Sequence, residues 1–171
     1  MKKNIILIGY RGAGKTTIGK ILANKINYNF IDSDEQIEKS EGRKISEIVK
    51  KEGWQYFREV EKKIIKQLGS EKNAVISTGG GIVLNIENVN NLKENGWFVY
   101  LETTPETIVK RIQNDDNRPS LTGVKSFIEE VTEVLEQRKE LYEKYADFKI
   151  LTDNMTPEKI SEVIENEFRK I

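Results

Sequence analysis

The stretch Asn4–Thr17, "NIILIGYRGAGKTT", decides the fold of this chain. A short apolar run leads into "GYRGAGKT", which fits the pattern G-x-x-x-x-G-K-[ST], and an amphipathic segment follows it. In this arrangement the glycines let backbone N–H groups wrap around phosphates, and the N-terminus of the next helix points its dipole at their charge. The stretch therefore predicts a strand, a phosphate-binding loop and a helix, in that order.

The loop also predicts how a nucleotide is held. Lys15 is expected to reach the β- and γ-phosphates, and the hydroxyl of Thr16 is expected to bind Mg²⁺. A structural glycine turn is the other interpretation, but it gives no reason for the lysine. The expected phosphate-binding residues are Gly12, Ala13, Gly14, Lys15, Thr16 and Thr17.

The composition narrows the chemistry. Lys plus Arg and Asp plus Glu number 28 each, so the formal net charge of zero favours neither a nucleic acid nor a membrane as partner. The 171 residues include no cysteine and no histidine, which excludes disulfides, thiol nucleophiles and imidazole chemistry. The apolar run after "MKKN" is too short for a secretory signal, and no stretch approaches membrane-spanning length. We expect a single cytoplasmic domain over residues 1–171.

Short apolar runs alternate with longer amphipathic segments along the chain. The expected strands are Asn4–Ile8, Tyr28–Asp32, Ala74–Ser77, Trp97–Leu101 and Phe148–Leu151. The expected helices lie at about 15–26, 34–40, 44–51, 54–68, 86–95, 105–113, 125–145 and 157–169. This alternation predicts an α/β fold with a largely parallel sheet. Ligands of such sheets bind beyond the carboxyl ends of the strands, which groups residues 9–17, 32–34 and 79–81.

A phosphate-binding loop alone does not distinguish motors, switches and kinases. The sequence has no N-K-x-D or T-K-x-D segment for guanine and no ABC-type signature. In "NFIDSD", Asp32 ends the second expected strand, where it is expected to hold Mg²⁺ through water. Asp34 could contact a hydroxyl group of the molecule that receives the phosphate. The alternative is that it is the N-cap of the next helix, and both roles could hold at once.

Two arginines and three glycines indicate a second, anionic ligand. Arg58 lies beside the apolar stripe of "WQYFREVEKKIIKQL" and can pair with Glu61. Arg138 stands in "FIEEVTEVLEQRKELYEKYA" where a leucine would be expected, and a planar guanidinium suits a carboxylate or phosphate. An ion-paired surface arginine is the alternative for each. Gly79–Gly81 favour the close approach of a ligand. These residues indicate a small kinase whose acceptor carries hydroxyls and a negative group.

With these motifs in this order, the chain resembles the shikimate kinases, which phosphorylate the 3-hydroxyl of shikimate on the route to chorismate and aromatic amino acids. The resemblance runs from Asn4 to about Ile150. It rests on "GYRGAGKTTIGK", "FIDSD", "IEKSEGRKISEIVKKEGWQYFREVE", "VISTGGG", "VYLETTPETIVKRI", "RPSL" and "RKELYEKYAD". It implies a three-layer α/β/α P-loop kinase fold with five parallel strands in the order 2-3-1-4-5. It also implies a shikimate-binding part at 34–61 and a lid at 113–124.

The resemblance further implies roles for individual residues, with ATP as co-substrate. Arg58 and Arg138 match the family's contacts to the shikimate carboxylate, and Asp34 matches the contact to the ring hydroxyls. Arg111 matches the group that stacks on adenine. The expected substrate-binding residues are Asp34, Arg58, Gly79, Gly80, Gly81 and Arg138. The expected catalytic residues are Lys15, Asp34 and Arg118, of which Lys15 and Arg118 also bind ATP and stabilise the transferring phosphoryl group. The expected Mg²⁺ ligands are Thr16 and, through water, Asp32.

Two departures from the family pattern leave points open. "RPSL" lacks a usual second leucine, which could loosen the packing of the lid, and "LTDNMTPEKI" matches the adenine loop too weakly to assign a contact. Gluconate kinase is the alternative enzyme, but the triple glycine and "FRxxE" favour shikimate. A nucleotide-binding regulatory domain without turnover is the other alternative. Against it stand the retained residues Lys15, Asp32, Asp34, Arg58, Arg118 and Arg138. The small size favours a monomer.

Overall fold

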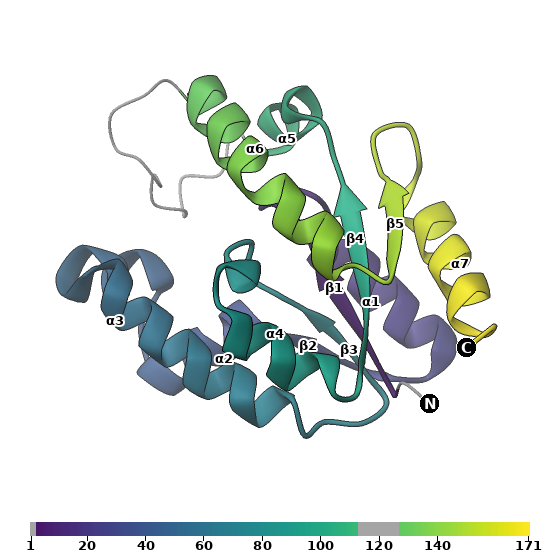
Figure 1. Cartoon of the computed structure of the whole chain (residues 1–171), viewed down its shortest axis with the longest axis horizontal. Helices are drawn as coiled ribbons and strands as arrows, with labels where there is room; N and C mark the ends of the chain where they lie inside the picture. The colour runs from purple at the N-terminus through teal and green to yellow at the C-terminus, as the bar shows by residue number, and fades with distance from the viewer. Residues whose placement is uncertain (1–2, 113–126) are drawn as a thin grey trace.

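The computed structural model describes residues 3–112 and 127–171 (Figure 1). The expected lid at 113–124, with Arg118, lies outside these residues. Among the described residues no helix combines the length and the apolar character needed to cross a lipid bilayer.

A parallel sheet forms the centre of the molecule. Within the described ranges it has five strands in the order β2-β3-β1-β4-β5, and every neighbouring pair is parallel. The strands are β1 (Asn4–Ile8), β2 (Asn29–Asp32), β3 (Ala74–Ser77), β4 (Gly96–Glu102) and β5 (Phe148–Leu151). All five residues of the central strand β1 are buried, because helices cover both faces of the sheet. That burial explains why "NIILI" is continuously apolar.

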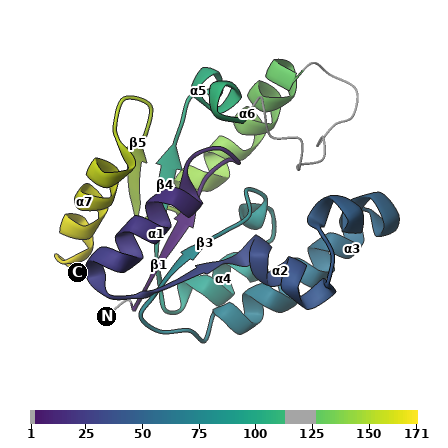
Figure 2. The same ribbon diagram turned by 180° about the vertical axis from the view of Figure 1, so that it is seen from behind.

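Helices pack on the two faces of the sheet and complete three layers (Figures 1 and 2). They are α1 (Lys15–Ile26), α2 (Ser33–Glu41), α3 (Ile45–Leu68), α4 (Ile86–Lys93), α5 (Pro105–Ile112), α6 (Phe127–Tyr145) and α7 (Pro157–Phe168). Leu22 of α1 and Ile164 of α7 join Leu7 in one apolar core. Ile65 of α3, Leu92 of α4 and Tyr142 of α6 belong to a second core with Ile6. The fold and strand order expected from the resemblance are confirmed.

The two helices expected at 44–51 and 54–68 are confirmed as the two parts of α3, which meet at a kink where Gly53 takes a φ of 85°. Two local differences from the sequence-based expectation have physical causes. Strand β2 begins one residue late, because Asn27 caps α1 in the left-handed conformation and delays the extended chain. A 3-10 turn at Ile82–Leu84 (η1), which periodicity did not indicate, follows the glycine run.

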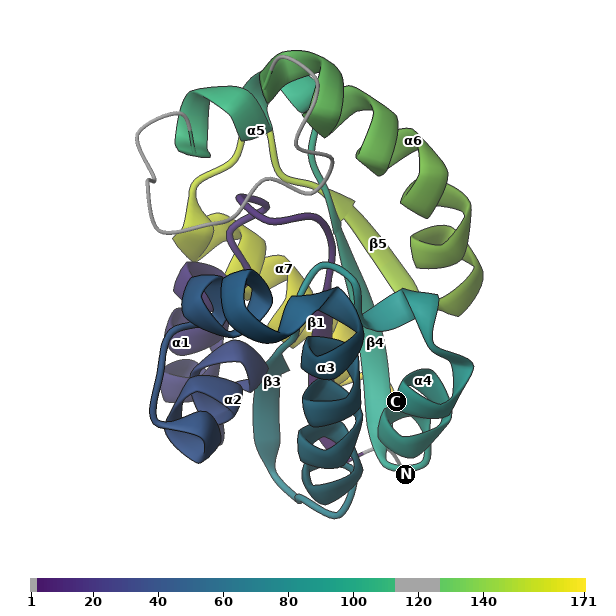
Figure 3. The ribbon, with the colours of Figure 1, turned by 90° about the vertical axis from the view of Figure 1, so that its left-hand side faces the viewer.

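The carboxyl ends of β1, β2 and β3 meet at one edge of the sheet because these strands are parallel neighbours. The loop after β1 therefore lies beside the segments that follow β2 and β3. Figure 3 shows this loop between α5 and α6 on one side and α2 and α3 on the other. The three segments grouped from the sequence do come together.

Candidate active site

The loop after β1 has the backbone of a phosphate cradle. Gly12 and Gly14 have φ values of 82° and 94°, a region that side-chain-bearing residues rarely adopt. A Cβ on Gly12 would also come within 2.6 Å of a methyl carbon of Ile112. Gly14 is the N-cap of α1, whose first turn carries no acidic side chain. The N-terminal dipole of α1 is thus available to an anion.

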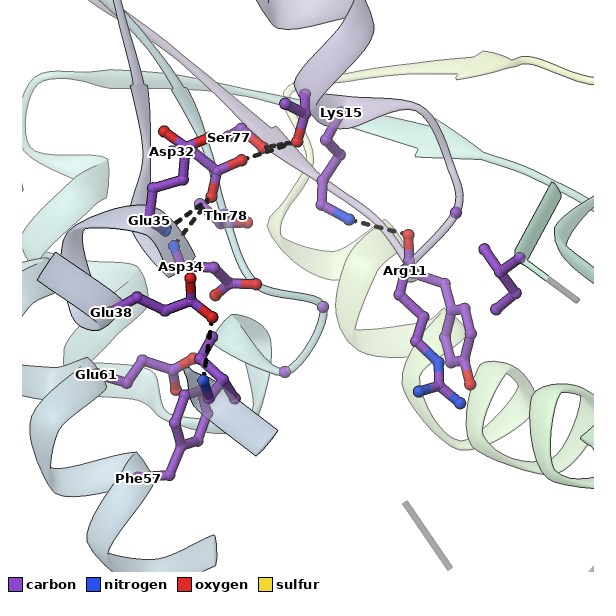
Figure 4. A pocket seen from close by; sticks show the side chains of 18 of the residues that line it. Arg11, Lys15, Asp32, Asp34, Glu35, Glu38, Phe57, Glu61, Ser77 and Thr78 are labelled. Carbon is purple, nitrogen blue, oxygen red and sulfur yellow. Dashed lines mark hydrogen bonds between the residues drawn. The ribbon is translucent and has the colours of Figure 1, made fainter. Parts of the chain in front are cut away.

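Lys15 lies in the concavity of this loop (Figure 4). Its Nζ donates hydrogen bonds to the carbonyl oxygens of Gly9 at 2.7 Å and Tyr10 at 2.9 Å, and the residue is buried. The ammonium group is therefore held by its own loop where phosphates would bind. The position fits the sequence-based expectation for this lysine.

Thr16 and Asp32 place two oxygen atoms that could bind a metal ion beside the loop. The Thr16 hydroxyl donates to Asp32 Oδ2 at 2.8 Å and lies 3.5 Å from the Ser77 hydroxyl. Hydroxyl and carboxylate oxygens are the ligands that Mg²⁺ takes, together with water and phosphate oxygens. These residues fit the expected metal site.

Asp32 also caps a helix, which corrects one interpretation of the sequence. Its Oδ1 accepts the backbone N–H groups of Asp34 at 3.0 Å and Glu35 at 3.4 Å, so Asp32 is the N-cap of α2. The alternative that Asp34 caps this helix is wrong. In Figure 4 the Asp34 carboxyl lies between Asp32 and Glu61. Asp34 lines the cavity described below.

Arg58 is held by its neighbours on α3. Its Nη1 donates to Glu61 Oε1 at 2.8 Å and Oε2 at 3.0 Å, so the predicted pairing is confirmed. The guanidinium also lies 5.1 Å from the ring centroid of Phe57 and 5.6 Å from that of Trp54. Burial raises the pKa of the Glu61 carboxyl, while the charges of Arg58 and Arg138 lower it. Glu61 thus fixes the direction of a guanidinium whose side chain is still 28% exposed and open to a ligand.

The three glycines after β3 leave room for side chains of the site. A Cβ on Gly81 would lie 2.3 Å from Arg58 Nη2, and one on Gly79 would lie 2.9 Å from Asp34 Oδ1. A Cβ on Gly80 would lie 3.3 Å from the backbone nitrogen of Arg11. None of the three has a positive φ, so space and not backbone conformation requires glycine. The sequence predicted that a ligand comes close to these glycines. In part it is the protein's own side chains that do so.

These groups line a shared cavity of about 800 Å³. Lys15 and Thr16 line it from the loop after β1 and the start of α1, and Arg58 of α3 and Arg138 of α6 also line it. Ala13 is the exception among the described site residues, because it is buried and does not line the cavity. The predicted residues that line it are Gly12, Gly14, Lys15, Thr16, Thr17, Asp32, Asp34, Arg58, Gly79, Gly80, Gly81, Arg111 and Arg138.

Arg111 ties the phosphate loop to the segment after β5. Its Nη1 donates to the Gly12 carbonyl at 3.2 Å and to the Thr152 hydroxyl at 3.4 Å. Nearby, Asp153 accepts hydrogen bonds from the hydroxyls of Thr104 and Thr107. Burial acts to raise the pKa of Asp153, but these hydrogen bonds and the Arg111 charge lower it overall. Sequence reasoning missed this anchoring, and the only signal for it was the "TD" pair directly after the last strand.

Two further contacts were missed. Arg11 Nη2 pairs with Glu130 Oε1 of α6 at 2.9 Å, and both side chains are largely buried. The Tyr142 hydroxyl donates to the Gly80 carbonyl. Each contact joins residues more than 60 positions apart in the chain, at 119 and 62 positions. No local pattern indicates such a pairing.

Comparisons of the sequence and of the structure with known proteins agree on one family. The family model described as shikimate kinase matches residues 11–169. The chain is 44% identical to the shikimate kinase of Thermodesulfovibrio yellowstonii over 169 residues, which cover 99% of this chain and 96% of that protein. It is 43% identical to the shikimate kinase of Persephonella marina, over 92% of this chain and 94% of that one. Among solved structures, shikimate kinase from Acinetobacter baumannii in complex with shikimate superposes with a TM-score of 0.94 at 35% identity, covering 99% and 94% of the two chains.

Proposed function

The chain belongs to the shikimate kinase family, and we propose on that premise that it transfers the γ-phosphoryl group of ATP to the 3-hydroxyl of shikimate. The observation that carries the proposal is the shared cavity, which has a phosphate cradle at one end and Arg58 and Arg138 at the other. A kinase whose acceptor carries both hydroxyls and a carboxylate needs one part that binds the ATP phosphates and another that binds the carboxylate. The product, shikimate 3-phosphate, lies on the route to chorismate and aromatic amino acids.

The donor end binds the nucleotide through the loop at residues 12–17. Backbone N–H groups of the loop hold the phosphates, and Lys15 exchanges its carbonyl partners for phosphate oxygens. Thr16 would hold Mg²⁺ directly and Asp32 would hold it through water. The metal would supply charge that neutralises the β- and γ-phosphates. Arg111 packs on adenine, and Arg118, from the segment outside the described residues, completes the charge around the transferring group.

The acceptor end binds shikimate through its carboxylate. Arg58 and Arg138 form charge-assisted hydrogen bonds with the carboxylate, and the backbone at Gly79–Gly81 lies against the ring. Asp34 accepts a hydrogen bond from a ring hydroxyl and turns the 3-hydroxyl towards the phosphate. A loose phosphoryl-transfer transition state needs little deprotonation of the nucleophile, so orienting the hydroxyl is the main role of Asp34.

The decisive experiment measures ADP release with Mg²⁺ and ATP in three parallel reactions: without an acceptor, with shikimate, and with gluconate. We expect rapid release with shikimate alone, and one phosphate on the 3-hydroxyl by mass spectrometry and phosphorus NMR. Equal release with gluconate would favour the sugar-acid kinase. Nucleotide binding without release under any condition would favour a regulatory domain.

We also propose that the protein works in the cytoplasm as a monomer. Light scattering coupled to size-exclusion chromatography measures the oligomeric state. A mass near 19.7 kDa is the expected result, and a mass near twice that value would contradict it.

A further inference from the structure

Tyr142 connects α6 to the glycine run, the two segments that form part of the acceptor end. It lies on α6 one turn after Arg138, it is fully buried, and its hydroxyl donates to the Gly80 carbonyl oxygen at 2.5 Å. The charge of Arg138 acts to lower the pKa of the same hydroxyl, against the effect of burial. A Cβ on Gly80 would lie 3.7 Å from Arg138 Nη1, so the guanidinium is beside this glycine. The Tyr142 hydroxyl therefore ties the part of α6 that carries Arg138 to the glycine run.

The phenol ring of Tyr142 is fixed independently of its hydroxyl. It stacks on Tyr100, with ring centroids 5.1 Å apart and an angle of 22° between the planes. Burial raises the pKa of the Tyr142 hydroxyl to about 12, so the group remains a hydrogen-bond donor at neutral pH. Phenylalanine would fill the same space in this core. The hydroxyl is therefore explained by its polar contacts rather than by packing.

A hydrogen bond to the Gly80 carbonyl restricts the conformation of the whole glycine run. Three consecutive glycines have no side chains to restrict their backbone, so the loop gains order from contacts made by other segments. The Gly80 carbonyl and the Gly81 N–H belong to one planar peptide unit. A hydrogen bond to that carbonyl consequently sets the direction of the Gly81 N–H and the approach of Gly81 to Arg58.

We propose that Tyr142 is a positioning residue for the acceptor carboxylate. Its hydroxyl bonds the turn of α6 that follows Arg138 to the Gly80 peptide, so that the Arg138 guanidinium and the glycine run present a single anion-binding face. The inference rests on the proposed function, because it assumes that Arg138 contacts the carboxylate of shikimate. It assigns Tyr142 no contact with the substrate.

The test compares Tyr142→Phe with Tyr100→Phe, which removes the hydroxyl from the other ring of the same stack. For Tyr142→Phe we expect the KM and Kd for shikimate to rise about two- to tenfold, the effect of one hydrogen bond. The KM for ATP and the melting temperature should stay close to those of Tyr100→Phe, whose shikimate affinity should match the unaltered protein. The fluorescence of Trp54, which lines the cavity beside Arg58, reports shikimate binding directly.

A double variant gives a second measurement. In an Arg138→Ala background, Tyr142→Phe should weaken shikimate binding by less than it does in the unaltered protein, because the guanidinium whose place beside Gly80 depends on this bond is gone. Equal shikimate affinity in Tyr142→Phe and Tyr100→Phe would overturn the inference, as would parallel losses for shikimate and ATP. If the unaltered protein does not phosphorylate shikimate, the proposed function itself fails, and that result is distinct from either of these.

Discussion

The two ends of the cavity are built in different ways. At the donor end, Lys15 bonds to carbonyl oxygens five and six residues earlier in the same loop. At the acceptor end, Gly79 bonds to Ser33 across 46 positions and Gly80 to Tyr142 across 62. The cradle around Lys15 is thus a local structure that a contiguous motif specifies, while Asp32 and Arg111 add longer-range contacts at its rim. The acceptor end forms only when segments far apart in the sequence come together. A substitution there should therefore also disturb neighbouring residues of the site, whereas a substitution at the donor end should not.

The largest effect is expected for Lys15→Met. The transferring phosphoryl group loses a positioned charge, so turnover should fall by about 10³-fold. The hydrogen bonds of Lys15 to Gly9 and Tyr10 lie within its own loop, so the thermal melt and shikimate affinity should change little. Turnover and shikimate titration of the same preparation measure both. Near-normal turnover would remove the phosphate-loop assignment, and a large loss of shikimate affinity would break the contrast between the two ends.

The next effects are expected for Arg58→Ala and Arg138→Ala. Each should weaken shikimate binding by about 2–5 kcal/mol, as expected when one partner of a desolvated charge pair is removed, and leave ATP binding nearly intact. Arg43→Ala is the control, because Arg43 pairs with Glu41 and Glu52 outside the cavity. Calorimetric titration with each substrate measures the affinities. Unchanged shikimate affinity in both variants would mean that the acceptor binds elsewhere.

Asp34→Asn should reduce turnover by about 10²-fold while ATP binding is retained, because the acceptor hydroxyl loses its orienting carboxylate. The chain has no histidine, so the pH–rate profile of the unaltered protein should show no imidazole limb near neutrality. Profiles of both proteins at saturating substrates are the measurement. Full turnover in the variant would assign the orienting role to another group.

Gly81→Ala should act through a neighbour. The added Cβ would displace the flexible end of Arg58, so shikimate affinity should fall by about 1–3 kcal/mol with little loss of stability. In an Arg58→Ala background the same substitution should have almost no further effect on shikimate affinity. Additive losses in the double variant would show that Gly81 acts on the ligand itself and not through Arg58.

The smallest effect is expected for the pH dependence of Glu61→Gln. Because the pKa of Glu61 is raised in the folded protein, its folded state holds the proton more tightly than the unfolded chain does. The stabilisation is full below the unfolded pKa and is lost as the pH rises through the folded one. The melting temperature of the unaltered protein relative to Glu61→Gln should therefore fall as the pH rises above the ordinary glutamate pKa of 4.5, with shikimate binding weakened less than in Arg58→Ala. An opposite slope would show that the Arg58 ion pair dominates over burial.

The contrast between the two ends also explains what the sequence could predict. The strand–loop–helix unit from Asn4 to Ile26 could be placed closely, because glycine spacing and periodicity act over short range. Arg58 and Arg138 could be recognised because a charge interrupts an apolar stripe. Tyr142 and the Arg11–Glu130 pair could not, since a tyrosine fits an apolar stripe and the partners are 62 and 119 positions away. The resemblance, rather than periodicity, supplied the order of the strands.

The central place of β1 has a consequence for how the chain is made. This strand is synthesised before both of its partners in the sheet, β3 and β4, which end at Ser77 and Glu102. At about 5–20 residues per second, "NIILI" remains without its second neighbour for roughly 5–20 s on the ribosome. An apolar segment with high strand propensity is prone to aggregate during such a wait. The apolar segment that begins the nucleotide site therefore needs shielding from other chains until β4 has been made.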